Sequence, residues 1–338
     1  MIDHAPDAVL SMAPRARSSG FLVLLAAVTL IPLLGVPLAL GLATAQITGP
    51  LPGALLLATI TGPMHVAATG FFYFDRAFRP VMSENRFSCT WSLAWLPLTI
   101  LGLGLAGAAL IGPWGYLIIF SFHNIWLFYH YQRQNFGLAS FVSTHVGVGR
   151  LPPRVNTVLN VAALGAIVAL LGTPGFYPNP EGIIPAHAYV ALRTAGTIVY
   201  LTSVVLMLWV FRSEPRLRDS VWLTGALIVC VAFFLPTIVC RNAGMAFLPV
   251  AFTHGAQYIM MMSVVSGRSS RGVLGLLTMC AVGVGAGLAL NAMKVWPALL
   301  VAMGITQVHF LVDARVWRLR EPRQRAIMRD RFDFLLTA

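Results

Sequence analysis

Residues 21–45 read FLVLLAAVTLIPLLGVPLALGLATA, a stretch without a single charged side chain. A helix rises about 1.5 Å per residue, so roughly 20 such residues cross the hydrocarbon core of a bilayer. The stretch is too long for the apolar region of a cleavable signal peptide. We therefore expect a first membrane-spanning helix here, preceded by a cytoplasmic tail of residues 1–19 that carries Arg15 and Arg17.

Apolar runs of similar length recur along the chain, which has 338 residues, of which 58% are hydrophobic and only 10% charged. This composition is typical of a polytopic membrane protein. The sequence predicts an all-α bundle of about ten transmembrane helices in one transmembrane domain, residues 20–314. The expected spans are 21–45, 53–74, 92–112, 114–132, 155–173, 187–211, 220–240, 243–266, 272–291 and 295–314. Segment 135–149 is too short to cross, and we expect it to lie at the interface or to re-enter.

The net charge of +12 follows the positive-inside pattern rather than that of a nucleic-acid-binding protein. If both termini are cytoplasmic, all but three of the 23 basic residues lie on the inner side, the exceptions being Arg193, Arg241 and Lys294. We expect Arg193, inside the sixth helix, to snorkel to the outer surface, with binding of an anionic group as the alternative. The lipid bilayer is thus the expected partner, and nucleic acid is not.

The tail, residues 315–338, is basic and amphipathic. It mixes arginines with Trp317, Leu319, Ile327 and Phe332. Such a segment is drawn to anionic headgroups, so we expect it to lie along the cytoplasmic lipid surface.

Six ionisable side chains lie inside the expected spans, where the bilayer penalises a full charge by roughly 3 to more than 10 kcal/mol. They are His65, His123, His130, His254, His309 and Asp313. Imidazole can stay neutral, but each ring still needs hydrogen-bond partners or a metal. The function is therefore expected where these residues meet.

The expected topology gives each histidine a depth. His65, His123 and His254 lie near the midplane, whereas His130 and His309 lie nearer the cytoplasm. His123 and His130 are seven residues apart, roughly 10 Å along one helix face, too far to bind a single ion together. Their alternatives are two separate sites, one metal ligand and one proton or substrate group, or a hydrogen-bonded seam between helices.

We predict His65, His123, His254 and His309 as metal ligands. His130, Asp313 and Tyr258 are the candidate catalytic, proton-relay or second-metal groups. Asp313 follows His309 by four residues and so shares its helix face, where it can bind metal or orient the imidazole. The alternative for Asp313 is an ion pair with a nearby arginine. Further polar candidates on the same helices are Asn124, Gln132 and Gln257.

Imidazoles with an occasional carboxylate suit iron, copper or zinc, and we expect iron first. Haem held by two histidines is the lesser alternative, since no CxxCH motif is present. Single histidines on separate helices resemble the arrangement in bacterioopsin-related carotene dioxygenases. That resemblance implies a non-haem iron and cleavage of a polyene. HGAQY (254–258) and HFLVDARVW (309–317) also resemble patterns in bacterial multispanning membrane proteins, and they imply a bacterial inner-membrane location but no activity.

Three functions remain open from the sequence. The first is an integral-membrane metalloenzyme that carries out an O2-dependent oxidation of a lipophilic substrate. The second is a proton- or ion-coupled transporter with the buried groups as a relay. The third is a haem-binding electron-transfer protein.

Overall fold

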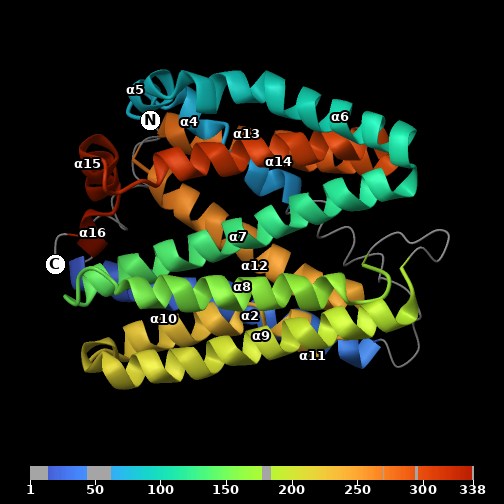
Figure 1. Ribbon diagram of the computed structural model, residues 1–338. Coiled ribbons are helices and arrows are strands. Elements are labelled where there is room, and N and C mark those ends of the chain that lie inside the picture. The colour runs from blue at the N-terminus through green and yellow to red at the C-terminus, as the bar shows by residue number, and fades with distance from the viewer. Residues whose placement is uncertain (1–13, 44–61, 177–183, 269, 294–295, 337–338) are drawn as a thin grey trace.

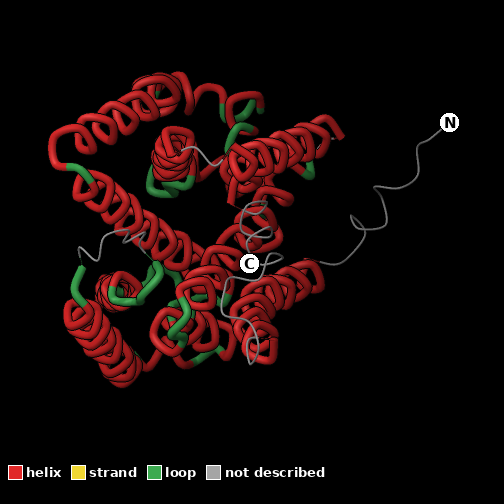
Figure 2. The backbone as a smooth tube through the Cα atoms, turned by 90° about the vertical axis from the view of Figure 1, so that its right-hand side faces the viewer, coloured by secondary structure: helices red, strands yellow, loops and turns green. Residues whose placement is uncertain are grey.

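The computed structural model describes residues 14–43, 62–176, 184–268, 270–293 and 296–336. Within these ranges the regular structure is helical throughout and contains no strand (Figure 2). The prediction of an all-α fold is confirmed.

The helices follow one another with short connections. In chain order they are α2 (Pro14–Ala43), a helical segment at 62–68, α4 (Phe71–Phe74), α5 (Arg79–Glu84), η1 (Phe87–Trp91), α6 (Ser92–Ile111), α7 (Pro113–His145), α8 (Pro153–Leu171), α9 (Ala186–Ser213), η2 (Pro215–Arg218), α10 (Val221–Ala232), α11 (Leu235–Val239), α12 (Ala243–Ser266), α13 (Ser270–Met293), α14 (Trp296–Val316), α15 (Pro322–Arg331) and α16 (Asp333–Leu336).

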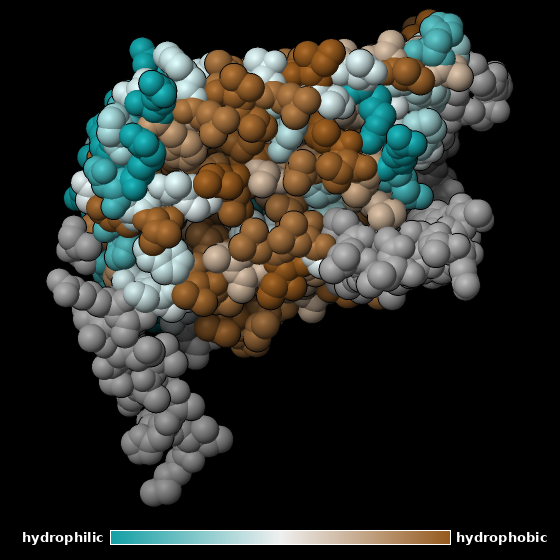
Figure 3. Space-filling view, turned by 90° about the horizontal axis from the view of Figure 1, so that it is seen from below, coloured by the Kyte–Doolittle hydropathy of each residue, from teal (hydrophilic) through white to brown (hydrophobic). Residues whose placement is uncertain are grey.

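Seven helical spans within the described residues are long and apolar enough to cross a membrane. They are Ser18–Gly35, Phe87–Ile111, Pro153–Leu171, Ala186–Ser213, Val221–Val239, Arg271–Leu290 and Pro297–Val316. Figure 3 shows the matching surface, with an apolar belt across the middle and hydrophilic residues toward the ends. Helices α7 and α12 have 33 and 24 residues and are also long enough, but both carry many polar side chains. The chain is therefore a helical membrane bundle.

Most predicted spans agree with the structure to within a few residues, and α12 matches 243–266 at both ends. The predicted span 220–240 is divided into α10 and α11 just before Pro236. Of the predicted span 53–74, residues 53–61 lie outside the described residues. The rest forms the helical segment 62–68, a turn and α4.

Helix α7 departs most from the sequence prediction. It runs without interruption from Pro113 to His145, so the prediction of a separate interfacial or re-entrant segment at 135–149 was wrong. The middle of the helix therefore falls at Tyr129 rather than at 123. This shift decides which of its two intramembrane histidines lies at the centre of the bundle.

The polar residues that interrupted the apolar run of α7 are paired inside the protein. Gln132 Nε2 donates to Asn156 Oδ1 on α8 (3.3 Å), and Gln134 Nε2 donates to Gln257 Oε1 on α12 (2.9 Å). Because neighbouring helices satisfy these side chains, the helix continues through a stretch that lipid alone would not accept.

Helix α7 lies between two groups of helices (Figure 1). Helices α6, α13 and α14 lie on one side of it, and α8, α9, α10 and α2 lie on the other. Helix α12 crosses obliquely behind α7. The first and last described helices, α2 and α16, are in contact at one end of the bundle.

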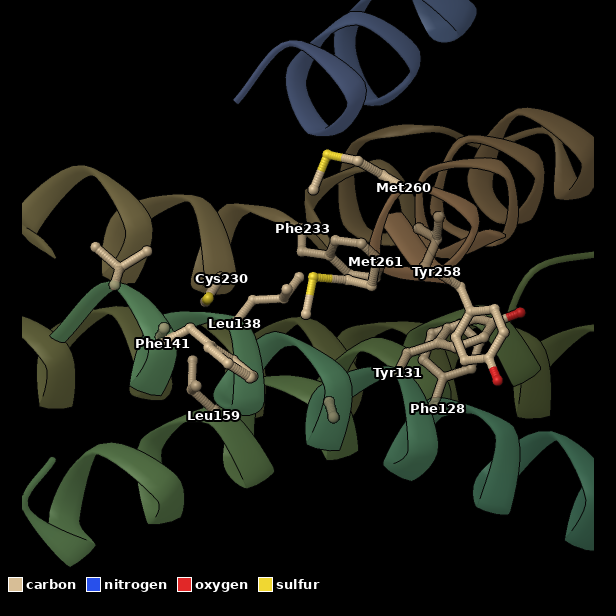
Figure 4. Packing of buried hydrophobic residues seen from close by; sticks show 14 of the residues in the cluster. Phe128, Tyr131, Leu138, Phe141, Leu159, Cys230, Phe233, Tyr258, Met260 and Met261 are labelled. Atoms are coloured by element: carbon tan, nitrogen blue, oxygen red, sulfur yellow. The ribbon is translucent and has the colours of Figure 1, made fainter. Parts of the chain in front are cut away.

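The core follows the inner faces of α7, α10 and α12 (Figure 4). Phe128 and Tyr131 of α7 gather with Tyr258 of α12 at one end of the view, and Leu138 and Phe141 continue the cluster along α7. Aromatic rings thus pack densely where α7 and α12 cross, and this packing holds the polar centre described below.

Helices α8 and α9 approach each other closely through glycines. A Cβ at Gly196 would lie 2.2 Å from the backbone nitrogen of Ala169, and one at Gly165 would lie 2.4 Å from that of Tyr200. Close contact of this kind, through small residues, is a common way for helices to associate in a membrane.

Arg193, on α9, connects that helix to the ends of α8 and α11, whereas snorkelling to the outer surface stays a prediction. Its Nη1 donates to Thr173 Oγ1 (2.8 Å), and its Nη2 donates to the carbonyls of Ile238 (2.7 Å) and Cys240 (2.9 Å). A cation at the end of α11 satisfies carbonyls that the helix leaves unpaired.

We expect Arg193→Met to lower the stability of the bundle by about 2–3 kcal/mol, the worth of one to two hydrogen bonds to a charged group. Three acceptors lose their donor, but the site is only half-buried, so water replaces part of the loss. Thermal unfolding in detergent measures the change. Arg241→Met is the control, since Arg241 is exposed. Equal melting temperatures for the two variants would contradict the bridging role.

The tail packs onto the end of the bundle. The Phe332 ring is fully buried and lies 6.3 Å from Phe21 and 5.2 Å from Phe141, measured between centroids. Arg331 pairs with Asp75 at 3.6 Å. Phe332 therefore faces protein rather than lipid, whereas contact of the tail's outer arginines with headgroups stays a prediction.

Candidate metal centre

Four helical segments each bring one histidine to the crossing of α7, α12 and α14. His130 lies at the middle of α7, His254 at the middle of α12 and His309 three residues beyond the middle of α14. His65 comes from the segment 62–68. All four side chains are buried, with exposed fractions of 0–8%.

The four imidazoles form a closed ring. Centroid distances around it are 4.9 Å from His65 to His254, 5.0 Å from His254 to His130, 4.8 Å from His130 to His309 and 5.0 Å from His309 to His65. Across the ring, His254 and His309 lie 6.4 Å apart.

Imidazoles that bind one ion through bonds of about 2.1 Å have ring centroids about 4.5–5.2 Å apart when they are neighbours. The four neighbour distances of the ring fall in this range. The spacing of the rings is therefore compatible with metal ligands, and the distances between the ligand atoms decide which of them can share an ion.

Asp313 adds a carboxylate to the ring. Its Oδ2 lies 3.7 Å from His309 Nε2 and 3.9 Å from His130 Nε2, close to the roughly 3.4 Å between two ligands of a tetrahedral ion. Two groups in the described chain have the spacing of metal ligands, with ligand atoms within 4.8 Å of one another. They are His65, His254 and His309, and His130, His309 and Asp313.

Several ring nitrogens in this centre have no hydrogen-bond partner among the described residues. They are both nitrogens of His254 and the Nε2 atoms of His130 and His309. Each buried polar atom left unsatisfied costs about 1–3 kcal/mol. An ion bound by His309 Nε2 together with one nitrogen of His254, or with His130 Nε2, would satisfy two of these atoms at once.

Behind the ring, Thr69 and Tyr258 connect His309 to Asp313 through a chain of hydrogen bonds. Thr69 Oγ1 lies 2.6 Å from His309 Nδ1 and 2.8 Å from the Tyr258 hydroxyl. Tyr258 donates to Asp313 Oδ1 at 2.9 Å. The chain thus connects two members of the candidate ligand set through residues outside it.

Aromatic side chains enclose the ring. Phe310 stacks on His130 with centroids 4.2 Å apart, and Tyr131 lies 4.2 Å from His254. This packing limits water around the ring and strengthens electrostatic interactions within it.

The structure brings together most, but not all, of the predicted site residues. His65, His254, His309, Asp313 and Tyr258 meet in one place. His130, predicted as a catalytic group, lies in the ring itself.

His123 lies apart from this centre, outside both groups with metal-ligand spacing. Its Nδ1 lies 3.1 Å from Gln307 Nε2. The physical reason is the length of α7: the two histidines are two turns apart, and the true middle of the helix is next to His130.

The remaining polar candidates form hydrogen bonds away from the ring, within one helix or between helices. Asn124 Nδ2 donates to the Phe120 carbonyl of its own helix (2.8 Å), and Gln132 contacts α8 as described above. Gln257 Nε2 donates to Thr29 Oγ1 (3.0 Å) and so connects α12 to α2.

Thr69 is the member of the centre that the sequence analysis missed. The sequence contains one indication of its role: Thr69 follows His65 by four residues, and residues four apart share a helix face. Threonine is common in apolar helices, so without the partners on α12 and α14 nothing set this one apart.

An apolar groove of about 590 Å³ lies between α2 and α12. On α12 it is lined by Phe252, Ala256 and Ile259, nearly opposite the face that carries His254 and Tyr258. The full lining is Phe21, Leu24, Val28, Met64, Phe252, Ala256, Ile259, Met260, Ser263 and Val264. The groove is therefore not the mouth of the centre.

Comparison with protein family models, with curated proteins and with solved structures finds no match for this chain. The function is accordingly argued from the geometry of the centre.

Proposed function

We propose that the chain is an integral-membrane metalloenzyme whose histidine ring and Asp313 bind one transition-metal ion. The observation that carries this proposal is the closed ring of four buried imidazoles at 4.8–5.0 Å. Residues from four helical segments converge there, and packing alone gives no reason to place four polar rings against one another in an apolar interior.

Iron is the first choice of metal, with copper and zinc as alternatives. Imidazole and carboxylate ligands suit all three, and such ligands around an open position are typical of non-haem iron oxygenases. Either group of three side chains would leave further positions of an octahedral ion free. An O2-dependent oxidation of a small lipophilic molecule is the reaction we propose there.

The proposal of a lipophilic substrate rests on the position of the ring at the middle of the helices. His130 and His254 lie at the middles of helices about 50 and 36 Å long, at roughly 1.5 Å per residue. A site at that depth is reached most easily by a molecule already dissolved in the bilayer. The resemblance to carotene dioxygenases points to the same class of substrate.

The proposed location is a bacterial inner membrane, with both termini in the cytoplasm. The positive-inside distribution of arginines supports this orientation, and so does the contact of α2 with α16 at one end of the bundle. Ten crossings follow if α7, α12 and the segment that ends at 68 span the bilayer with the seven apolar spans.

Haem fits the ring less well than a single ion does. His254 and His309 are the pair across the ring, but His65 and His130 each lie about 5 Å from both of them. These two rings occupy the space that a flat macrocycle between the axial ligands would need.

Metal analysis of the full-length protein purified in detergent tests the proposal. We expect about one iron per chain, and no Soret band in the absorption spectrum. A folded protein that contains no metal and takes up none from Fe²⁺, Cu²⁺ or Zn²⁺ would overturn the proposal and favour transport. A Soret band would favour the haem protein.

A further inference from the structure

The hydrogen bonds behind the ring have a fixed direction. Three contacts join His309 to Thr69 (2.6 Å), Thr69 to Tyr258 (2.8 Å) and Tyr258 to Asp313 (2.9 Å). Each contact needs one proton. Thr69 and Tyr258 supply one hydroxyl proton each, so the third proton comes from one end of the chain.

A metal-binding carboxylate is ionised and accepts only. The Tyr258 proton therefore points to Asp313 Oδ1, and the Thr69 proton points to the Tyr258 oxygen. Both hydroxyl protons are then used. The remaining contact takes its proton from His309 Nδ1, which donates to Thr69 Oγ1.

This order decides which nitrogen of His309 faces the ion. A neutral imidazole protonated at Nδ1 keeps its lone pair at Nε2. Nε2 is the atom that lies 3.7 Å from Asp313 Oδ2 and has no hydrogen-bond partner among the described residues. A partner at the far nitrogen of a ligating histidine fixes its tautomer and its ring orientation.

We propose that Thr69 is a positioning residue that holds His309 as the Nδ1–H tautomer, so that Nε2 alone binds metal. The inference rests on the proposed metal centre and adds a residue that touches no ion. It also limits the stoichiometry. With Nδ1 occupied by Thr69, His309 serves one ion at a time, so the two ligand groups that share it are alternative positions of a single ion.

Nitrogen-15 NMR of the full chain, labelled at histidine, reads the tautomer directly in detergent. We compare the wild type with Thr69→Val, which keeps the shape but removes the hydroxyl, and with Thr69→Ser, which keeps the hydroxyl. His309→Ala assigns the signal. In Zn²⁺-loaded protein we expect a proton on Nδ1 of His309 whose NMR signal shows a hydrogen bond in the wild type and in Thr69→Ser, and the loss of that hydrogen bond in Thr69→Val.

The second readout is metal affinity, measured by titration with Zn²⁺ and Fe²⁺. We expect Thr69→Val to bind metal roughly 10- to 100-fold more weakly, as variants that lose such an orienting partner typically do, and Thr69→Ser to bind within a few-fold of the wild type. Circular dichroism shows whether each variant is folded, and Thr69→Ser provides the comparison if Thr69→Val is not.

The two readouts separate the two proposals. A wild type that binds no metal overturns the metalloenzyme and the inference that rests on it. In a wild type that binds metal, the absence of a proton on Nδ1 of His309, or an Nδ1 proton signal that does not change in Thr69→Val, overturns the inference alone.

Discussion

Replacing His254 with Ala should lower metal affinity by at least about 100-fold, because loss of a residue that merely orients a ligand already costs roughly 10- to 100-fold. His254 contributes a ring with two unpartnered nitrogens and lies next to His65 and His130. Titration of the purified variant with Fe²⁺ or Zn²⁺ measures the loss. Bound metal in the protein as isolated should fall in parallel.

His123→Ala is the matched control. It removes the same side chain from a membrane-spanning helix, but from the pair with Gln307 rather than from the ring. We expect its metal content to equal that of the wild type. Loss of metal in both variants, or in His123→Ala alone, would contradict the assignment of the metal centre to the histidine ring.

Gly196→Leu should prevent α8 and α9 from packing, with a loss of stability of about 3 kcal/mol or more. Even a Cβ at this position would lie 2.2 Å from the backbone of Ala169, and backbone cannot rotate away as a side chain can. The two helices would have to separate along their whole contact. Thermal unfolding and the yield of monodisperse protein in detergent measure the effect.

Gly225→Leu on α10 is the control for the general effect of replacing a helical glycine with a larger side chain. A Cβ at Gly225 meets nothing within 4 Å, and replacing a mid-helix glycine removes an unfavourable entropy term of about 0.5–1 kcal/mol. We expect wild-type stability or slightly more. Similar losses in the two variants would show that the glycine contact is not what joins α8 to α9.

Hydropathy predicts the bounds of a helix whose side chains are mostly apolar. It does not predict them where polar side chains of a spanning helix are paired with other helices. Helix α12 was placed correctly at both ends although it contains His254. The predicted span for helix α7 ended at residue 132, because glutamines end its apolar run. Their partners lie on α8 and α12, more than 20 residues away in sequence, and a local pattern carries no trace of them.

The same limit governed the candidate centre. Composition pointed to His65, His254, His309 and Asp313 because an ionisable residue in a span is costly by itself. His130 and not His123 lies in the ring, and this depends on the true length of α7, which the apolar run alone did not show. Thr69 carries no such cost on its own and could be recognised only from its contacts.

The order in which the ring residues occur along the chain has a consequence for biosynthesis. His65 lies in the first quarter of the sequence, whereas His309 and Asp313 lie in the last long helix. A nascent chain halted before α14 would hold three of the four imidazoles and no carboxylate. On the proposed function, such a chain could not retain its ion. Metal loading would therefore have to follow the insertion of α14 and would mark a chain in which that helix is in place.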